Sequence, residues 1–322
     1  MNVISGIHHI TAIAGDPQRN IDFYTGVLGL RLVKATVNFD DPEAYHFYYG
    51  DGHGRPGTIL TFFSWLGARR GRPGHGQVTA ASLAVPRDSL SFWMEHLSAN
   101  GIAPEKQAER FGQPVLSFTD PDGMYLELIE TPAIESSHAW EGGSVPPEFA
   151  IHGFHSATLS EREYEPTAKL LTETMGFHLL GHEHNRFRYE SVHSHASGAG
   201  RFIDVVHDNA APEGRVAVGS IHHIAFRTPD DRQQQEWLAE IGDLGYIISP
   251  VMDRVYFHSI YYREPGGILF EIATDSPGFA IDEPVEQLGE ALQLPPWLET
   301  QRPRIEAALP PIQRHPYQVA TR

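Results

Sequence analysis

A strand-like segment of similar sequence recurs four times along the chain, and this repetition constrains the fold more than any other feature. The four segments read GIHHITAIAG, QVTAASLAVP, GFHSATLS and SIHHIAFRTP. A helix-like segment follows each one, with apolar residues at helical spacing, such as Ile21, Tyr24 and Leu28. Each unit then ends in β-rich sequence with a glycine turn before its last strand, as in DPDGMYLELIE and EPGGILFEIAT. The sequence therefore predicts four βαβββ units.

The predicted fold class is α+β, with four βαβββ modules paired into two cupped half-barrel domains. A unit of this kind curls its sheet around a concave face, so two units can enclose a cleft. The modules are expected at about residues 4–66, 76–131, 150–208 and 219–274. We expect the first two modules to form an N-terminal domain over 1–140 and the last two to form a C-terminal domain over 141–274. We expect residues 275–322 to form a C-terminal tail packed over the body, with partial disorder as the alternative.

Composition excludes several classes of function. The chain has no cysteine, so disulfides, thiolate metal sites and cysteine nucleophiles are ruled out. A net charge of −17 repels phosphate backbones, which argues against nucleic acid as a partner. No apolar run reaches the length of a membrane span, and the first residues do not resemble a signal peptide. We therefore expect a cytoplasmic protein with a small-molecule partner, and a homo-oligomer is possible.

An adjacent histidine pair lies in the opening strand of both the first and the fourth unit, as HHIT and HHIA. Because side chains alternate along a strand, the apolar set should pack against the helix and the other set should face the cleft. That leaves His9 facing the cleft in the first unit and His223 in the fourth. We expect His8 and His222 to lie behind or beside them.

The last strand of the fourth unit carries one acidic residue that faces the same cleft. In ILFEIA, the apolar face is formed by Ile268, Phe270 and Ile272, and Glu271 lies on the other face. An ionised carboxylate in mid-strand is costly to bury unless something compensates it, and a metal ion would. Aligning PGTILTF with PGGILFE puts Phe62 at the equivalent position of the first unit, so we expect no fourth protein ligand.

The first and fourth units thus offer two imidazoles and one carboxylate for a metal. This set, with open coordination positions, is typical of non-haem Fe(II) oxygenases, whereas a closed structural site usually has four ligands. Substrate and O₂ could bind together at the open positions. Mn(II) would fit the same ligands.

Other polar clusters are weaker candidates. Glu127 and Asp204 occupy the final-strand position of the middle units and His155 lies near the first-strand position, but QVTAAS contains no histidine, so this cleft is one imidazole short. We interpret Glu127 mainly as structural. The triplets HEH (182–184) and HSH (193–195) have chelating spacing but lie among Gly, Ser and Asn, which is typical of solvated loops.

The repeat, together with HHIT, FYTGVLGLRLV, DPDG followed by LEL, and GGILFE, resembles the vicinal oxygen chelate superfamily. The motifs GFHSATL and IYYREPGG resemble more closely its four-module ring-cleaving dioxygenases of the hydroquinone type, over about residues 4–290. The resemblance implies Fe(II), sometimes Mn(II), held by residues matching His9, His223 and Glu271. It also implies that the substrate site is lined by residues matching Thr11, His155, His222, Arg254 and Tyr261.

The activity implied by the resemblance is insertion of O₂ into a dihydroxylated aromatic ring, most simply a hydroquinone. Imidazoles with near-neutral pKa suit proton transfer, which makes His155 and His222 the candidates for that task. Tyr261 could hydrogen-bond the bound hydroxyl, although packing in an aromatic-rich strand would also explain it. Thr11, Arg254 and Tyr261 are the expected substrate-binding residues.

Three other functions remain possible on the same fold. A catechol-type extradiol dioxygenase is the nearest, although in such enzymes the ligands come from the third and fourth units. A glyoxalase-type isomerase or thiol transferase usually adds a second carboxylate to the site, which Phe62 does not supply. A non-catalytic small-molecule-binding module would not need the metal trio.

Overall fold

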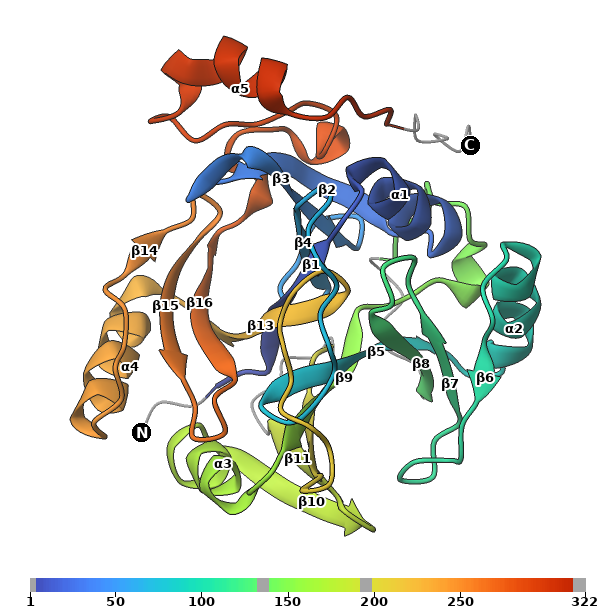
Figure 1. The fold of residues 1–322 in the computed structure, drawn as a ribbon, viewed down its shortest axis with the longest axis vertical. Coiled ribbons are helices and arrows are strands. Elements are labelled where there is room, and N and C mark those ends of the chain that lie inside the picture. Colours follow the sequence, from blue (N-terminus) through green and yellow to red (C-terminus); the bar gives the residue numbers. More distant parts are fainter. Residues whose placement is uncertain (1–3, 132–138, 192–198, 315–322) are drawn as a thin grey trace.

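The computed structural model describes residues 4–131, 139–191 and 199–314. Its two eight-stranded sheets are curled into half-barrels, and helices lie at the periphery (Figure 1). The predicted α+β class with cupped half-barrels is confirmed. No helix in these ranges is long and apolar enough to cross a membrane.

Each sheet combines two βαβββ units. The first contains, in order across it, β14 (Met252–Asp253), β15 (Phe257–Arg263), β16 (Leu269–Pro277), β13 (Ser220–Thr228), β1 (Ile7–Ala14), β4 (Ile59–Ser64), β3 (Asp41–Gly50) and β2 (Arg31–Asn38). The second contains β10 (Phe177–Glu183), β11 (Arg186–Ser191), β12 (Phe202–His207), β9 (Phe154–Glu161), β5 (Gln77–Pro86), β8 (Tyr125–Thr131), β7 (Val115–Thr119) and β6 (Glu105–Lys106).

The units do not pair in chain order. β1 pairs antiparallel with β13, which joins the first unit to the fourth, and β5 pairs with β9, which joins the second to the third. The expected division into a domain over 1–140 and another over 141–274 therefore does not describe the sheets. Every unit offers its first strand as the edge to be paired, so the repeat alone does not determine which two edges meet.

Helices begin and end at recognisable signals. Asp16 accepts a hydrogen bond from the amide of Arg19 and so caps α1 (Pro17–Ile21), which continues as a π-helical turn over Asp22–Val27. Asp230 caps α4 (Asp231–Asp243) in the same way. The other helices are α2 (Leu90–Ala99), α3 (Glu165–Lys169) with a π-helical turn over Leu170–Thr174, and α5 (Arg302–Ala308), and short 3₁₀ turns span Pro147–Phe149, Phe279–Ile281, Val285–Gln287 and Glu299–Gln301.

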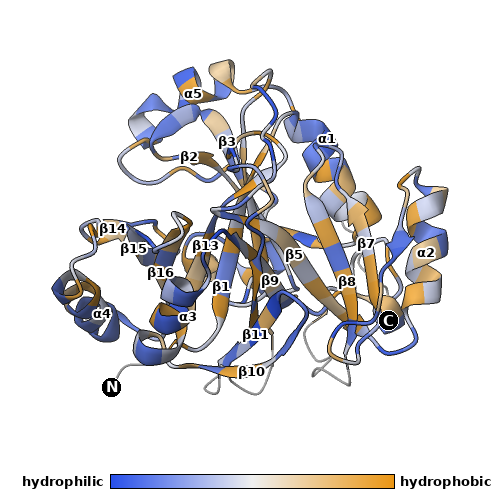
Figure 2. Cartoon of the chain, turned by 60° about the horizontal axis from the view of Figure 1, so that its bottom comes forward, coloured by the Kyte–Doolittle hydropathy of each residue, from blue (hydrophilic) through white to orange (hydrophobic). Residues whose placement is uncertain are grey.

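The core lies between the sheets and their helices. In Figure 2 orange segments interrupt blue ones along the strands, whereas α4 is mainly blue. That helix buries only Gln234, Trp237 and Ile241. Trp237 and its counterpart in the second unit, Trp93 on α2, are completely buried. The helices therefore cover the convex face of each sheet and leave its concave face uncovered.

The described part of the tail packs over β2 and β3 (Figure 1). The ammonium of Lys34 on β2 is completely buried and lies 2.5 Å from carboxylate oxygens of both Asp282 and Glu283. Ile305 on α5 is also buried. Residues 315–322 lie outside the described ranges.

Candidate active site

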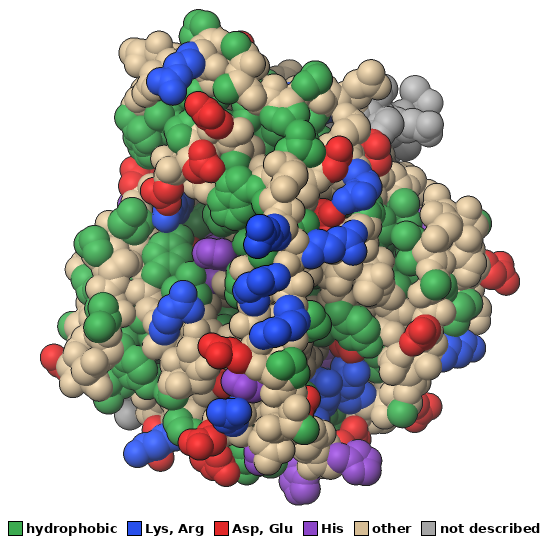
Figure 3. Space-filling view, viewed as in Figure 1, with side chains coloured by type: hydrophobic (Ala, Val, Ile, Leu, Met, Phe, Trp, Pro, Cys, Tyr) green, Lys and Arg blue, Asp and Glu red, His purple; other side chains and the backbone are tan. Residues whose placement is uncertain are grey.

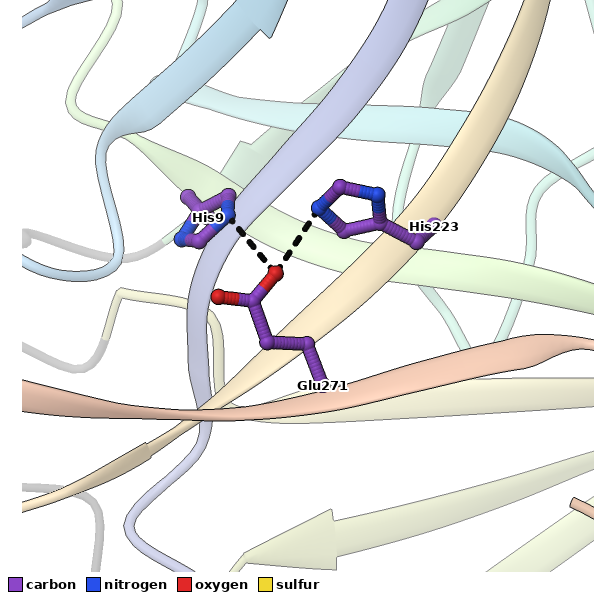
Figure 4. A group of neighbouring side chains, drawn as sticks. All are labelled: His9, His223 and Glu271. Atoms are coloured by element: carbon purple, nitrogen blue, oxygen red, sulfur yellow. Dashed lines mark ion pairs between the residues drawn. The ribbon is translucent and has the colours of Figure 1, made fainter. Parts of the chain in front are cut away.

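Three polar side chains converge on the concave face of the first sheet (Figure 4). His9 lies on β1, His223 on β13 and Glu271 on β16, and these strands are neighbours in the sheet. Glu271 Oε2 is 2.8 Å from His223 Nε2 and 3.3 Å from His9 Nε2. All three side chains are buried. They form a group of His, Asp or Glu residues, within the described ranges, whose ligand atoms lie close enough to hold one metal ion.

Two β-bulges shape this group. In the pairing of β1 with β13, the register skips His8 on one strand and His222 on the other. A bulge interrupts regular alternation, so these two residues do not point to the opposite face, as they would in a regular strand. Instead each lies beside its neighbour: His8 Nδ1 is 2.9 Å from His9 Nδ1, and His222 Nδ1 is 2.8 Å from His223 Nδ1.

The hydrogen bonds of His8 determine which nitrogen of His9 is free for a ligand. Burial, and next the neighbouring His9, lower the pKa of His8 well below its ordinary value, so its ring is neutral. His8 Nε2 lies 3.1 Å from the carbonyl oxygen of Thr274 and must donate to it, which leaves Nδ1 of His8 as an acceptor. His9 therefore donates from Nδ1 and presents the lone pair of Nε2 to Glu271, the arrangement a metal requires.

The same reasoning applies to the second pair. Burial lowers the pKa of His223, and it lowers the pKa of His222 to about 3, so both rings are neutral. When His223 presents its Nε2 lone pair to Glu271, its Nδ1 donates to His222 Nδ1. His222 then carries its proton on Nε2, and His222 lines the cleft.

Glu271 supplies the charge of the group. The hydroxyl of Ser259 donates to Oε1 at 2.5 Å, whereas no described residue donates a hydrogen bond of good geometry to the buried Oε2. When both rings hold their protons on Nδ1, two imidazole lone pairs and one carboxylate oxygen face one another. A divalent cation fits this donor set.

A cavity of about 270 Å³ opens beside the three residues. Its walls include Phe39, Phe63, Trp65 and Phe257. Figure 3 shows the hollow from outside, with a histidine at its floor and apolar side chains around it. The volume is near the lower end of the roughly 300–1,000 Å³ that is usual for small-molecule pockets, which suits a ligand with one aromatic ring.

Four of the five residues expected around the substrate line this cavity, namely Thr11, His222, Arg254 and Tyr261. Tyr261 faces Glu271 directly across the β15–β16 pair. Arg254 Nε donates to the Tyr261 hydroxyl at 3.3 Å, and its Nη1 donates to Asp40 at 3.3 Å. Because the Tyr261 oxygen accepts from Arg254, its own hydrogen remains to be donated.

His155 is placed elsewhere, which corrects its assignment as a catalytic residue. It lies on β9 in the second sheet, where Nε2 contacts Gln113 and Nδ1 contacts Ser156, each at 3.1 Å. In the β5–β9 pairing His155 is the residue skipped by the register. It is therefore the counterpart of His222 in the other half-barrel, and sequence similarity between the two units cannot separate these positions.

The second half-barrel fills the equivalent place with ion pairs. Arg110 binds both carboxylate oxygens of Glu127 at 2.7 and 2.8 Å. Arg188 binds Asp204 at 2.7 and 2.9 Å, and Arg186 binds the same carboxylate at 3.0 Å. The structural interpretation of Glu127 agrees with these contacts.

The position in the first unit that corresponds to Glu271 is Thr61, and the sequence alignment with Phe62 is wrong by one residue. Thr61 is opposite Thr11 in the parallel pair β1–β4, just as Glu271 is opposite Ala225 in the pair β13–β16. Phe62 points to the helix side, where its ring lies 4.5 Å from that of Tyr24. Thr61 is not a carboxylate either, so the site has no second acid at this position.

Sequence reasoning missed two further residues of the site, His46 and Ser259. His46 lies on β3 and lines the cavity. Both residues follow the period-two pattern of their strands, in YHFYY and HSIYY, so the signal was present but was not distinctive. Of the chelating triplets, HEH lies at the exposed end of β10, and HSH falls outside the described residues.

Comparison with known proteins gives a consistent result. MhqO of Bacillus subtilis (strain 168), a candidate ring-cleaving dioxygenase, is 48% identical over 310 residues, which cover 96% of each chain. The chlorohydroquinone/hydroquinone 1,2-dioxygenase of Sphingobium indicum is 37% identical over 302 residues, covering 92% of this chain and 93% of that protein.

Solved structures agree with the sequence relatives. A crystal structure of a candidate dioxygenase from Bacillus subtilis has a TM-score of 0.93 at 47% identity, covering 98% of this chain and 99% of that one. Glyoxalase I of Zea mays has the same fold, with a TM-score of 0.62 at 16% identity over 84% of this chain and 92% of that one.

The matching family model spans residues 6–128 and 153–272 and is described as the Glyoxalase/Bleomycin resistance protein/Dioxygenase superfamily. The resemblance predicted from the sequence is thereby confirmed, and the chain belongs to this superfamily.

Proposed function

We propose that the protein is a ring-cleaving dioxygenase that acts on a hydroquinone-type diol, with Fe(II) held by His9, His223 and Glu271. The observation that carries the proposal is the convergence of two imidazole lone pairs and one buried carboxylate oxygen beside an aromatic-walled cavity. The names of the two sequence relatives support ring cleavage and a para-diol substrate. Mn(II) would fit the same three ligands.

When bound, the metal would lower the cost of deprotonating the diol and mediate electron transfer between the ring and O₂. One O₂ is consumed per diol, and both of its atoms remain in the ring-opened product. The protein's own residues orient the ring and handle its protons. Tyr261, held by Arg254, donates its hydrogen to an oxygen of the diol. His222 presents Nε2–H to the cavity and can donate a hydrogen bond to an oxygen that gains electrons during the reaction.

The aromatic walls contribute by excluding water. Phe257 packs against the rings of both His8 and His9, with centroids 5.1 and 4.9 Å away. Phe63 contacts the ring of His222 at 5.8 Å. A dry wall strengthens the hydrogen bonds from Tyr261 and His222, because their electrostatic contribution rises as the local dielectric falls.

The test is anaerobic loading with Fe(II), followed by O₂ uptake with hydroquinone, chlorohydroquinone and catechol, with metal content assayed alongside. We expect about one O₂ per diol and faster turnover of the para-diols. Glu271→Gln should lose both the metal and the uptake. Glu127→Gln is the matched control, since it makes the same change at the equivalent strand position of the other sheet.

Different outcomes would point to different chemistry. Preference for catechol would favour an extradiol enzyme of the catechol type. Bound metal without uptake on any diol would refute the proposal and favour an isomerase or transferase, although Thr61 in place of a second acid argues against that class. Full uptake in Glu271→Gln would eliminate this site altogether.

A further inference from the structure

The first unit contributes its own polar wall to the cavity, opposite the wall formed by Arg254 and Tyr261. Tyr48 lies opposite Thr61 in the β3–β4 pair, and Tyr261 lies opposite Glu271 in the β15–β16 pair. The two tyrosines therefore hold equivalent positions in the repeat. Likewise His46 holds the register position that Ser259 holds in the fourth unit. The two walls are therefore counterparts in the repeat, but they carry different chemistry.

Four side chains of this wall form one continuous run of hydrogen bonds. The Tyr48 hydroxyl is 2.9 Å from His46 Nδ1, and His46 Nε2 is 2.9 Å from Thr61 Oγ1. Thr61 Oγ1 is in turn 2.9 Å from Thr11 Oγ1. Tyr48, His46 and Thr11 line the cavity, and Thr61 is completely buried behind them.

The direction of these hydrogen bonds follows from Tyr48, which is the buried end of the run. The Tyr48 side chain is 1% exposed, and burial holds its pKa well above the ordinary value, so it keeps its proton. Among the described residues, His46 is the hydrogen-bond partner recorded for the Tyr48 hydroxyl, and so Tyr48 donates to Nδ1. His46 then donates from Nε2 to Thr61, and Thr61 donates to Thr11.

The last hydrogen of the run belongs to Thr11 and has no acceptor in the described part of the chain. Thr11 shares its strand face with His9, two residues away, so this hydrogen lies beside the candidate metal site. A buried hydroxyl hydrogen without an acceptor is costly, which means that the wall is complete only when an oxygen of a ligand accepts it.

We propose that Tyr48, His46, Thr61 and Thr11 act as a relay of fixed polarity that delivers one hydrogen-bond donor to the second oxygen of the aromatic diol, the oxygen not bound to the metal. This inference rests on the proposed function and adds the basis of substrate choice. Within it His46 and Thr61 are positioning residues, and Thr11 contacts the substrate. The relay selects ligands with two oxygens over ligands with one. Because the relay donates a hydrogen bond, a ligand can also bind with an ether oxygen in place of its second hydroxyl.

Binding without turnover tests this directly. Mn(II)-loaded protein is titrated calorimetrically under argon with hydroquinone, 4-methylphenol, 4-methoxyphenol and 4-ethylphenol. One such hydrogen bond is worth about 1 kcal/mol, which corresponds to roughly five- to tenfold in the dissociation constant. Hydroquinone should therefore bind about five- to tenfold more tightly than 4-methylphenol, and 4-methoxyphenol should bind more tightly than 4-ethylphenol, which has the same shape.

The variants separate the relay from general packing. Thr61→Val keeps the shape but interrupts the run, and should reduce both preferences to within about twofold, whereas Thr61→Ser should retain them. Tyr48→Phe should weaken both preferences. Tyr45→Phe is its matched control, because that hydroxyl lies on the same strand and donates to Pro310 outside the cavity.

Each outcome bears on one proposal. Unchanged preferences in Thr61→Val and Tyr48→Phe, with metal content intact, would overturn the relay while leaving the dioxygenase proposal in place. A preference for hydroquinone without one for 4-methoxyphenol would refute the donor polarity and hence the relay as stated. Tight, relay-dependent diol binding without O₂ uptake would overturn the dioxygenase proposal alone, and failure to bind any diol would overturn both.

Discussion

Replacing Glu161 by glutamine should stabilise the folded protein at alkaline pH. Glu161 lies at the end of β9, almost fully buried, close enough to Glu264 to share a proton with it. Glu264 is the better site for the negative charge, because it accepts hydrogen bonds from the Thr167 hydroxyl at 2.5 Å and the Ile268 amide at 2.8 Å. Burial, and next the charge of Glu264, raise the pKa of Glu161 to about 9.

The sign of the effect follows from proton binding. Between the ordinary pKa of 4.5 and about 9, the folded protein holds a proton on Glu161 that the unfolded chain has released. The free energy of unfolding must therefore fall as pH rises through this window. The free energy of unfolding falls by at most about 1.4 kcal/mol for each pH unit. Because the protein rearranges around the pair, the total loss between pH 5 and pH 8 should be only a few kcal/mol.

Urea unfolding followed by circular dichroism at pH 5.5, 7 and 8.5 measures this loss. Glu161→Gln keeps the shape and a donor to Glu264 without a titrating proton, so its curve should be flatter and should lie above that of the wild type at pH 8.5 by about 2 kcal/mol. Glu163→Gln, an exposed change two residues away, is the control. Parallel pH profiles for the wild type and Glu161→Gln would refute the shared proton.

Three further changes test other contacts. Lys34→Met should destabilise the protein by about 3–5 kcal/mol in thermal unfolding, because it leaves the buried carboxylate of Glu283 unpaired. Ser259→Ala should weaken metal retention about 10–100-fold in a chelator competition assay, since Ser259 orients Glu271. Tyr261→Phe should slow diol turnover about 10–100-fold while the metal stays bound, and complete loss of metal in this variant would show that Tyr261 supports the ligands directly.

The sequence was sufficient for the elements of the site that depend on regular strand geometry. Alternation along three strands is enough to bring His9, His223 and Glu271 to one face, and the structure places these side chains together. The bulges at His8 and His222 could not be predicted, because an extra residue in one strand leaves no local pattern in the sequence. Their effect is large, since they convert two backbone neighbours into hydrogen-bond partners of the ligands.

Errors at the level of the repeat have a different cause. Choosing Phe62 over Thr61 assumed that the turn before the last strand has the same length in both units, and the register differs by one residue. Assigning His155 to the substrate site assumed that similar units share one cleft, but the pairing of first strands separates them. Repeats predict what each unit looks like, and the pairing of their edges is decided by long-range contacts.

The four equivalent final-strand positions explain why two similar half-barrels differ in chemistry. Three of them carry an acid on the concave face, namely Glu127, Asp204 and Glu271, and an acid buried there requires a positive charge nearby. In the second half-barrel, guanidinium groups supply that charge and occupy the space in which a ligand could bind. In the first, no guanidinium in the described ranges pairs with Glu271, and a cation from outside the chain would supply the charge. The open position beside that charge is what makes this half-barrel, and not its partner, suited to catalysis.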